Sequence, residues 1–245
     1  MALRIGRVPY LHTEPFYVGM RRRDVTLCPL VASAIAGAAH KGEIDAAPVP
    51  LVHCPGLADT WQPVAGFCIA SAQQAGSCLL HARQPISALS GVSIGIPDEA
   101  ATAVRLLDVL LQRKYHIQPG PYVSPQAAPE ALLLMGNEGL RQRRGGAGFA
   151  HTYDLGAEWH AWTGLPCVFA RWMVRREVST ADRTKLEEML YVGLEEGVNA
   201  LCELAKPRQD LLMLPRDVVT YIQGFRYYIG RAEEQAIEQF QHYIQ

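Results

Sequence analysis

The sequence predicts an α/β protein built from two lobes. Strand-like runs alternate with helical runs in much of the chain, which favours parallel α/β layers. With 49% hydrophobic and 19% charged residues, the 245-residue chain can bury a full core. Strand–helix units come first, then a different strand–helix block, then mostly helices, and this order suits one lobe interrupted by another. We place the first lobe at residues 1–73 and 171–245 and the inserted lobe at residues 74–170.

The amino-terminal segment predicts a strand, a turn and a helix. Arg4–Pro9 is a short β-type run closed by proline. Tyr10–Tyr17 reads as the strand-to-helix turn, with Thr13 as a candidate N-cap and Pro15 in the first helical turn.

The next segments predict one more helix and the first crossing between the lobes. Leu30–Lys41 is rich in alanine and favours a helix, and Ile44–Val52 is an apolar, strand-like stretch interrupted by prolines. Gly66–Ser71 and Ser77–Ala82 look like two strands joined by a polar connector. We expect the whole segment, residues 66–82, to be one of two hinge strands.

A strand and an amphipathic helix follow in the inserted lobe. Val92–Pro97 predicts the strand, and Asp98 stands where a helix cap belongs. Ala100–Lys114 predicts the helix, because apolar residues recur at spacings of three and four along it.

The last third predicts the return to the first lobe. Val168–Val174 alternates like a half-buried strand and is our second hinge candidate. Thr180–Ala205 predicts one long amphipathic helix, and shorter helices are expected after Pro215 and near Gly230.

Charge and motif content exclude several functions. A formal net charge of −1 gives no long-range attraction to nucleic acid or to a membrane surface. The histidines form no H-x-x-x-H pair and the cysteines form no C-x-x-C pair, so no metal site is expected. No P-loop is present either. The absence of a signal-like or membrane-spanning apolar run predicts a cytoplasmic protein. We expect it to be a monomer or a homodimer.

Two turns are candidate sites for an anion. Free N–H groups and the helix dipole favour negative charge at a helix N-terminus, and ligands of open α/β sheets lie beyond the carboxyl ends of strands. Leu11–Pro15 and Asp98–Ala103 both meet these conditions. His12 can be a general base, a hydrogen-bond donor or an ordinary loop residue. Ser77 lacks a G-x-S-x-G context, which argues against a hydrolase nucleophile. The residues alone therefore indicate a two-lobed binder of a small anion.

Several segments resemble one known family. RIGRVPYLHTEPFY, GSCLLHARQPISALSGVSIGI, AATAVRLLDVLL, LLLMGNEGLR and YDLGAEWHAWTGLPCVFARWMV follow one another over about residues 4 to 175. Together they resemble the chorismate dehydratases of the futalosine route to menaquinone. The resemblance implies a type II periplasmic-binding-protein-like fold with a central cleft, and dehydration of chorismate to 3-[(1-carboxyvinyl)oxy]benzoate. It implies no metal and no other cofactor, with a small anionic substrate as the only ligand.

The resemblance also assigns site residues. Ser77 and His12 are the implied catalytic residues, and Thr102 is expected to contact a substrate carboxylate together with helix N–H groups. The implied substrate-binding residues are Tyr10, Ala101, Thr102, Ala103, Gly136 and Asn137.

This chain departs from the family pattern at the implied site. His12 replaces an asparagine, Ala100 and Ala103 replace serines, and Asn137 replaces an aspartate with Gly139 where alanine is usual. The charge of His12 is expected to vary with pH, unlike that of an amide. Two alternatives therefore stay open: a non-catalytic binder or sensor of a small carboxylated metabolite, and a related enzyme with another carboxylated ring substrate.

Overall fold

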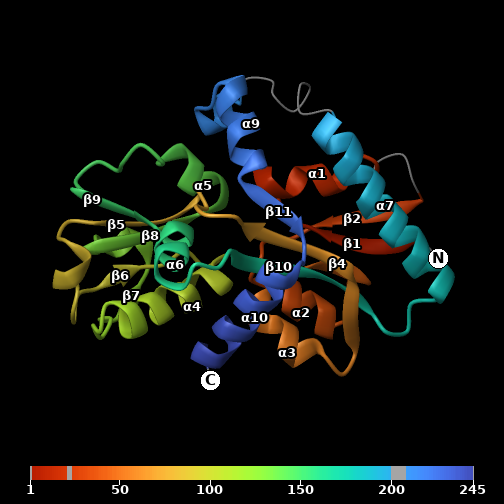
Figure 1. Ribbon diagram of the computed structural model, residues 1–245, viewed down its shortest axis with the longest axis horizontal. Coiled ribbons are helices and arrows are strands. Elements are labelled where there is room, and N and C mark those ends of the chain that lie inside the picture. The colour runs from red at the N-terminus through yellow and green to blue at the C-terminus, as the bar shows by residue number, and fades with distance from the viewer. Residues whose placement is uncertain (1, 21–23, 200–207, 245) are drawn as a thin grey trace.

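Two β-sheets lie side by side along the long axis of the molecule, with helices packed around them (Figure 1). The computed structural model describes residues 2–20, 24–199 and 208–244. The six-stranded sheet has the order β11-β4-β10-β3-β1-β2, and the five-stranded sheet has the order β7-β6-β8-β5-β9. The strands of the first sheet are β1 (Leu3–Arg7), β2 (Val25–Pro29), β3 (Ala46–Pro50), β4 (Trp61–Ser71), β10 (Cys167–Arg175) and β11 (Phe225–Tyr228). Those of the second are β5 (Cys78–Ala82), β6 (Ile94–Gly95), β7 (Tyr122–Val123), β8 (Ala131–Met135) and β9 (His151–Asp154).

The helices cover both faces of the first sheet. Helices α1 and α7 lie on one face, and α2, α3 and α10 lie on the other, while α4, α5 and α6 pack around the second sheet (Figure 1). The α-helices are α1 (Glu14–Tyr17), α2 (Ala34–His40), α3 (Cys54–Leu57), α4 (Thr102–Val109), α5 (Gly136–Arg141), α6 (Leu155–Thr163), α7 (Thr180–Asn199), α9 (Pro215–Gln223) and α10 (Arg231–Ile244). Short 3-10 turns include η1 (Leu11–Thr13), η3 (Leu51–His53), η4 (Ile86–Ala88), η6 (Pro125–Ala127) and η7 (Gln209–Leu211), and η5 (Leu110–Lys114) is a π-helical turn. In the described ranges no helix is both long and apolar enough to cross a membrane.

The chain passes between the sheets twice. Residues 72–77 lead from β4 to β5, and α6 leads from β9 back to β10. Both predicted hinge segments therefore contain strands next to a crossing, although the predicted lobe boundaries and the hinge motion stay predictions. Strand β10 pairs antiparallel with both β3 and β4, and β5 pairs antiparallel with β8 and β9. The sheets are thus mixed, and among the described strands the parallel pairs are those of β1 with β2 and β3, and of β6 with β7 and β8.

One hydrophobic cluster joins the two sheets. It contains Cys68 of β4 and Leu80 of β5, both fully buried. Trp159 of α6 packs against Phe240 of α10 with ring centroids 6.0 Å apart. The carboxyl-terminal helix therefore helps to hold the second sheet against the first, and its burial of aromatic surface contributes to their association.

Helix limits differ from the sequence prediction in three places. Helix α2 begins at Ala34 rather than Leu30, because the N–H of Leu30 donates to the carbonyl of Arg7 and extends the β1–β2 pairing. Asp98 is not the cap of α4, because a turn over residues 97–100 delays the helix to Thr102. The long helix predicted to Ala205 is helical from Thr180 to Asn199, and its last residues lie outside the described ranges.

Thr13 occupies the N-cap position of α1, as predicted, but its side chain does not cap the helix. Its hydroxyl lies 2.8 Å from the carbonyl oxygen of Val8 and 2.7 Å from that of Tyr10. The hydroxyl therefore ties down the turn that carries His12, while Pro15 lies in the first turn of α1 as expected.

Candidate functional site

A cavity lies between the two sheets and takes its walls from both. The space between its walls is about 610 Å³ when the part open to solvent is included, and the centre of a water-sized sphere can reach about 70 Å³ of it. Its polar side chains come from the turn after β1, from Ser77 directly before β5 and from the start of α4. The turn after β1 lies at the carboxyl end of its strand, as expected for a site in an open α/β fold. The lining residues are Val8, Tyr10, His12, Thr13, Ala32, Pro48, Pro50, Ile69, Ala75, Ser77, Cys78, Ala101, Thr102, Ala103, Met135, Gly136, Phe169, Ala170 and Phe225. The predicted residues His12, Ser77 and Thr102 therefore share one cavity.

His12 is held on two sides by aromatic residues of the carboxyl-terminal segment. Its ring stacks on Phe225 with centroids 4.7 Å apart and planes 8° apart. Its Nδ1 lies 2.8 Å from the hydroxyl of Tyr221, and the hydroxyl of Tyr227 donates to its backbone carbonyl at 3.0 Å. Burial lowers the pKa of His12 to about 3, because the charged imidazolium loses its hydration. His12 is therefore uncharged in neutral solution, and its charge changes with pH only in the acidic range.

Ser77 is 3% exposed and stands directly before β5. Its Oγ lies 2.7 Å from the hydroxyl of Tyr221. The carboxylate of Asp154 accepts hydrogen bonds from the backbone N–H groups of Ala75 and Gly76, and from Ala157 at the start of α6. Asp154 therefore fixes the backbone just before Ser77 while it caps α6.

Gly139 explains how α5 packs against this serine. A Cβ at position 139 would lie 2.3 Å from the carbonyl oxygen of Ser77. Only glycine permits this approach, and Gly139 therefore lets α5 pack close to Ser77.

Tyr221 connects the two sides of the cavity from behind its wall. It belongs to α9, and its hydroxyl contacts both His12 and Ser77. Burial raises its pKa well above the ordinary value, so it is a neutral phenol. Tyr221 is not among the predicted site residues, because nothing in the local sequence pattern indicates that α9 folds back onto the turn at His12.

The start of α4 offers backbone N–H groups to the cavity. Ala101, Thr102 and Ala103 all line it, and the first N–H groups of a helix have no acceptor within the helix. The hydroxyl of Thr102 donates to the carbonyl of Phe169 at 2.9 Å. Its proton is thereby directed at β10, and the contribution to an anion that this geometry favours is the backbone N–H groups.

Tyr10 presents a polar group that the protein leaves unpaired. The side chain is 5% exposed, and its buried hydroxyl makes no hydrogen bond of ordinary geometry with the described residues, although the Glu99 carboxylate and the Ala32 backbone lie near it. Burial, reinforced by the nearby Glu99 carboxylate, raises its pKa, so it remains a donor. Gly136 has φ +57°, and a Cβ there would lie 2.6 Å from the Tyr10 ring. The residue at position 136 thus shapes the cavity by letting Tyr10 lie against it.

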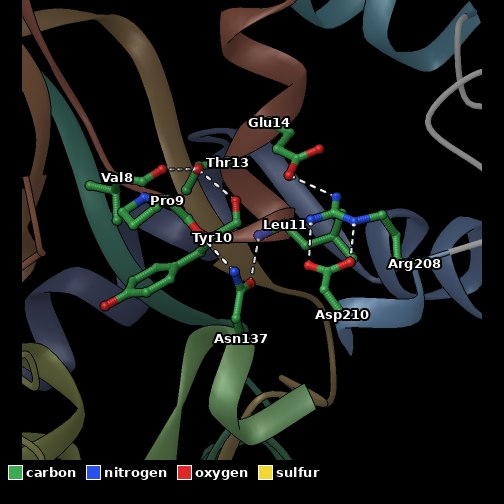
Figure 2. Close-up of polar contacts among 9 residues, drawn as sticks. All are labelled: Val8, Pro9, Tyr10, Leu11, Thr13, Glu14, Asn137, Arg208 and Asp210. Carbon is green, nitrogen blue, oxygen red and sulfur yellow. Dashed lines mark hydrogen bonds and ion pairs between the residues drawn. The ribbon is translucent and has the colours of Figure 1, made fainter. Parts of the chain in front are cut away.

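Asn137 lies beside the cavity but not in its lining. Its Oδ1 accepts from the N–H of Leu11 at 3.2 Å, and its Nδ2 donates to the carbonyl of Pro9 at 2.8 Å (Figure 2). Both ends of the amide are therefore engaged by the turn after β1, and the substrate contact that the resemblance implies for Asn137 stays a prediction.

An ion-pair cluster supports the same turn. Arg208 pairs with Glu14 of α1 at 2.8 Å and with Asp210 at 3.0 Å (Figure 2). Arg141 of α5 donates to the backbone carbonyl of Asp210 at 2.8 Å. The second sheet is thus tied through α5 to the segment after α7.

No metal-binding cluster of three or more His, Cys, Asp or Glu side chains exists in residues 2–20, 24–199 and 208–244. The site instead combines a neutral imidazole, a serine, buried phenols and helix N–H groups in one cavity. This geometry defines an α/β protein with two sheets and a shared cavity between them.

Comparison with known proteins places this chain in a family. The model of the menaquinone biosynthesis family matches residues 3–245, and the chain belongs to that family. The 1,4-dihydroxy-6-naphtoate synthase of Thermus thermophilus is 26% identical over 171 residues, which cover 65% of this chain and 61% of that enzyme. The match thus spans less than two thirds of the length of that relative.

Solved structures identify the fold. Protein AF1704 from Archaeoglobus fulgidus superposes with a TM-score of 0.79 at 13% identity, covering 99% of this chain and 96% of that one. The periplasmic aliphatic sulphonate binding protein SsuA from Escherichia coli gives a TM-score of 0.58 at 13% identity, covering 98% and 87%. The chain therefore has the periplasmic-binding-protein fold, and the prediction of this fold is confirmed.

Proposed function

We propose that this protein is a chorismate dehydratase that forms 3-[(1-carboxyvinyl)oxy]benzoate by removing water from chorismate. Membership of the menaquinone biosynthesis family supports the pathway. The observation that carries the reaction is the placement of His12 and Ser77 on one cavity, both hydrogen-bonded to the same buried hydroxyl.

The reaction asks little covalent chemistry of the protein. A proton leaves a ring carbon, the hydroxyl leaves as water, and the ring becomes aromatic, which makes the product strongly favoured. The protein has to orient a dianion, exclude water, accept one proton and protonate the leaving hydroxyl. The helix N–H groups at Thr102 and Ala103 and the unpaired hydroxyl of Tyr10 are suited to the carboxylates.

The test is incubation of the purified chain with chorismate, followed by chromatography of the products. We expect the wild-type protein to form the aromatic product, and Ser77→Ala to lower kcat by about 10²- to 10³-fold, within the range of general acid–base groups. The Cys28→Ser variant is the matched control, because Cys28 is half-buried on β2 and does not line the cavity. Absence of product at saturating chorismate and high enzyme concentration would reject the proposal.

A second candidate is a related enzyme that acts on another carboxylated ring. The similarity to a relative named as a naphthoate synthase favours it, because that name describes a different product. Under this alternative chorismate neither reacts nor raises the thermal unfolding midpoint, whereas another ring acid does both. A non-catalytic binder would instead be stabilised by a ligand that it leaves unchanged.

A further inference from the structure

The hydroxyl of Tyr221 bridges two groups that face the cavity from different lobes. It lies 2.8 Å from Nδ1 of His12 and 2.7 Å from Oγ of Ser77. His12 belongs to the turn after β1, Ser77 precedes β5, and Tyr221 comes from α9. Tyr221 itself does not line the cavity, so it acts on a ligand only through these two neighbours.

The protons available to His12, Tyr221 and Ser77 allow two arrangements of their hydrogen bonds. A phenol has one proton, so Tyr221 can donate to only one of its two neighbours and accepts from the other. In the first arrangement Nδ1–H of His12 donates to Tyr221, Tyr221 donates to Ser77, and Nε2 is an open acceptor. In the second, Ser77 donates to Tyr221, Tyr221 donates to Nδ1, and Nε2 carries the proton. Nε2 has no hydrogen-bond partner among the described residues, and the ring lines the cavity, so a ligand can reach it.

The environment of His12 opposes a charged intermediate. Burial lowers its pKa to about 3, and no carboxylate among the described residues forms an ion pair with it. Protonation of His12 to an imidazolium in this position would be unfavourable, because the buried cation would lose its hydration. If His12 takes up one proton at Nε2 while it releases another from Nδ1, the imidazole stays neutral throughout.

We propose that Tyr221 is a positioning residue that couples His12 and Ser77 into a proton relay between the two ends of the substrate. This inference rests on the proposed dehydration. The C–H bond of the ring carbon breaks, its electron pair forms the new ring double bond, and the proton goes to Nε2 of His12. The proton on Nδ1 passes to the oxygen of Tyr221, the phenol proton passes to Oγ of Ser77, and the proton of Ser77 passes to the leaving hydroxyl. That hydroxyl keeps the electron pair of the broken C–O bond and departs as water, so atoms and charge balance.

The surroundings hold Tyr221 in the bridging position. Its ring packs edge-on against Phe225 with centroids 5.1 Å apart. A Cβ on Gly76, directly before Ser77, would lie 3.3 Å from the Tyr221 ring. Phe225 also stacks on His12, so one aromatic residue fixes both ends of the His12–Tyr221 hydrogen bond.

The test compares two phenylalanine variants on chorismate. Tyr221→Phe removes the bridging hydroxyl and keeps the ring. Tyr228→Phe is the matched control, because Tyr228 is 45% exposed and does not line the cavity. We expect Tyr221→Phe to lower kcat by about 10²- to 10³-fold with KM within about 2-fold of wild type, while Tyr228→Phe changes kcat by less than about 3-fold. Equal kcat values for Tyr221→Phe and wild type would overturn the relay.

A second measurement uses the unaltered protein and so does not depend on the variants folding. A plot of the single-turnover rate against the deuterium fraction, in mixtures of H₂O and D₂O, should lie below the straight line that joins the rates in the two pure solvents, because several protons move in one step. A linear dependence would overturn the relay while leaving the dehydratase in place. Failure of the wild-type protein to form any product would instead reject the proposed function, and with it this role of Tyr221.

Discussion

The neutral state of His12 makes the stability of the protein fall when the solution becomes acidic. The pKa of His12 is about 3 in the folded protein, against 6.5 for an unperturbed histidine. At a pH between these two pKa values, His12 binds a proton in the unfolded chain but not in the folded chain, so a fall in pH favours unfolding. Stability is fully retained above pH 6.5 and is lost as pH falls from 6.5 toward 3.

The magnitude follows from the two pKa values. At pH 5 the unfolded histidine is almost fully protonated, and the folded one is almost fully neutral. The difference from pH 7 is about 2 kcal/mol in the free energy of unfolding at 25 °C. Most small domains have only about 5 to 15 kcal/mol of stability, so the loss is measurable.

Urea unfolding of the wild type and of His12→Asn at pH 7 and pH 5 isolates this effect. Other groups also titrate in this range: burial lowers the pKa of His81, and Arg4 contributes to lowering that of Asp45. These groups are present in both proteins, so their contributions cancel. We expect the wild type to lose about 2 kcal/mol more than the variant. A difference below about 0.5 kcal/mol would show that the folded protein protonates His12 readily and would refute the reasoning.

Three further predictions concern the supports of the site. Gly139→Ala should lower kcat with little loss of secondary structure, because the added Cβ would lie 2.3 Å from the carbonyl oxygen of Ser77 and would displace it. Circular dichroism and the chorismate assay measure the two effects, and an unchanged kcat would contradict this prediction. Asp154→Ala should lower the free energy of unfolding in urea by about 1 to 3 kcal/mol, because it leaves the N–H groups of residues 75, 76 and 157 without their carboxylate. Asn137→Ala should raise KM more than it lowers kcat, since it frees the turn that carries Tyr10 and His12, and steady-state kinetics with an unchanged KM would exclude that role.

The sequence predicted the features that depend on local pattern. The strands at Val168–Val174 and Val92–Pro97 were expected from alternation and apolar runs, and the structure has β10 and β6 there. The turns that carry His12 and Thr102 were expected from strand-to-helix signals, and both line one cavity. Local pattern failed at Asp98, where a turn of the backbone outweighed a good capping residue.

Long-range contacts account for what the sequence did not predict. Tyr221 is 209 positions from the histidine that it contacts, and no periodicity within α9 indicates this pairing. The same holds for Asn137, whose amide bonds a turn 126 and 128 positions earlier in the chain. Motif similarity placed Asn137 near the site, but only its backbone partners distinguish a bridging amide from a ligand-binding one.

A crystal structure with 3-[(1-carboxyvinyl)oxy]benzoate bound would test the central claim most directly. We predict density for the product between the two sheets, with hydrogen bonds to Ser77 Oγ or His12 Nε2 and a carboxylate at the N–H groups of Thr102 and Ala103. Product bound outside this cavity, or a cavity that stays empty at saturating product, would contradict the assignment of the site.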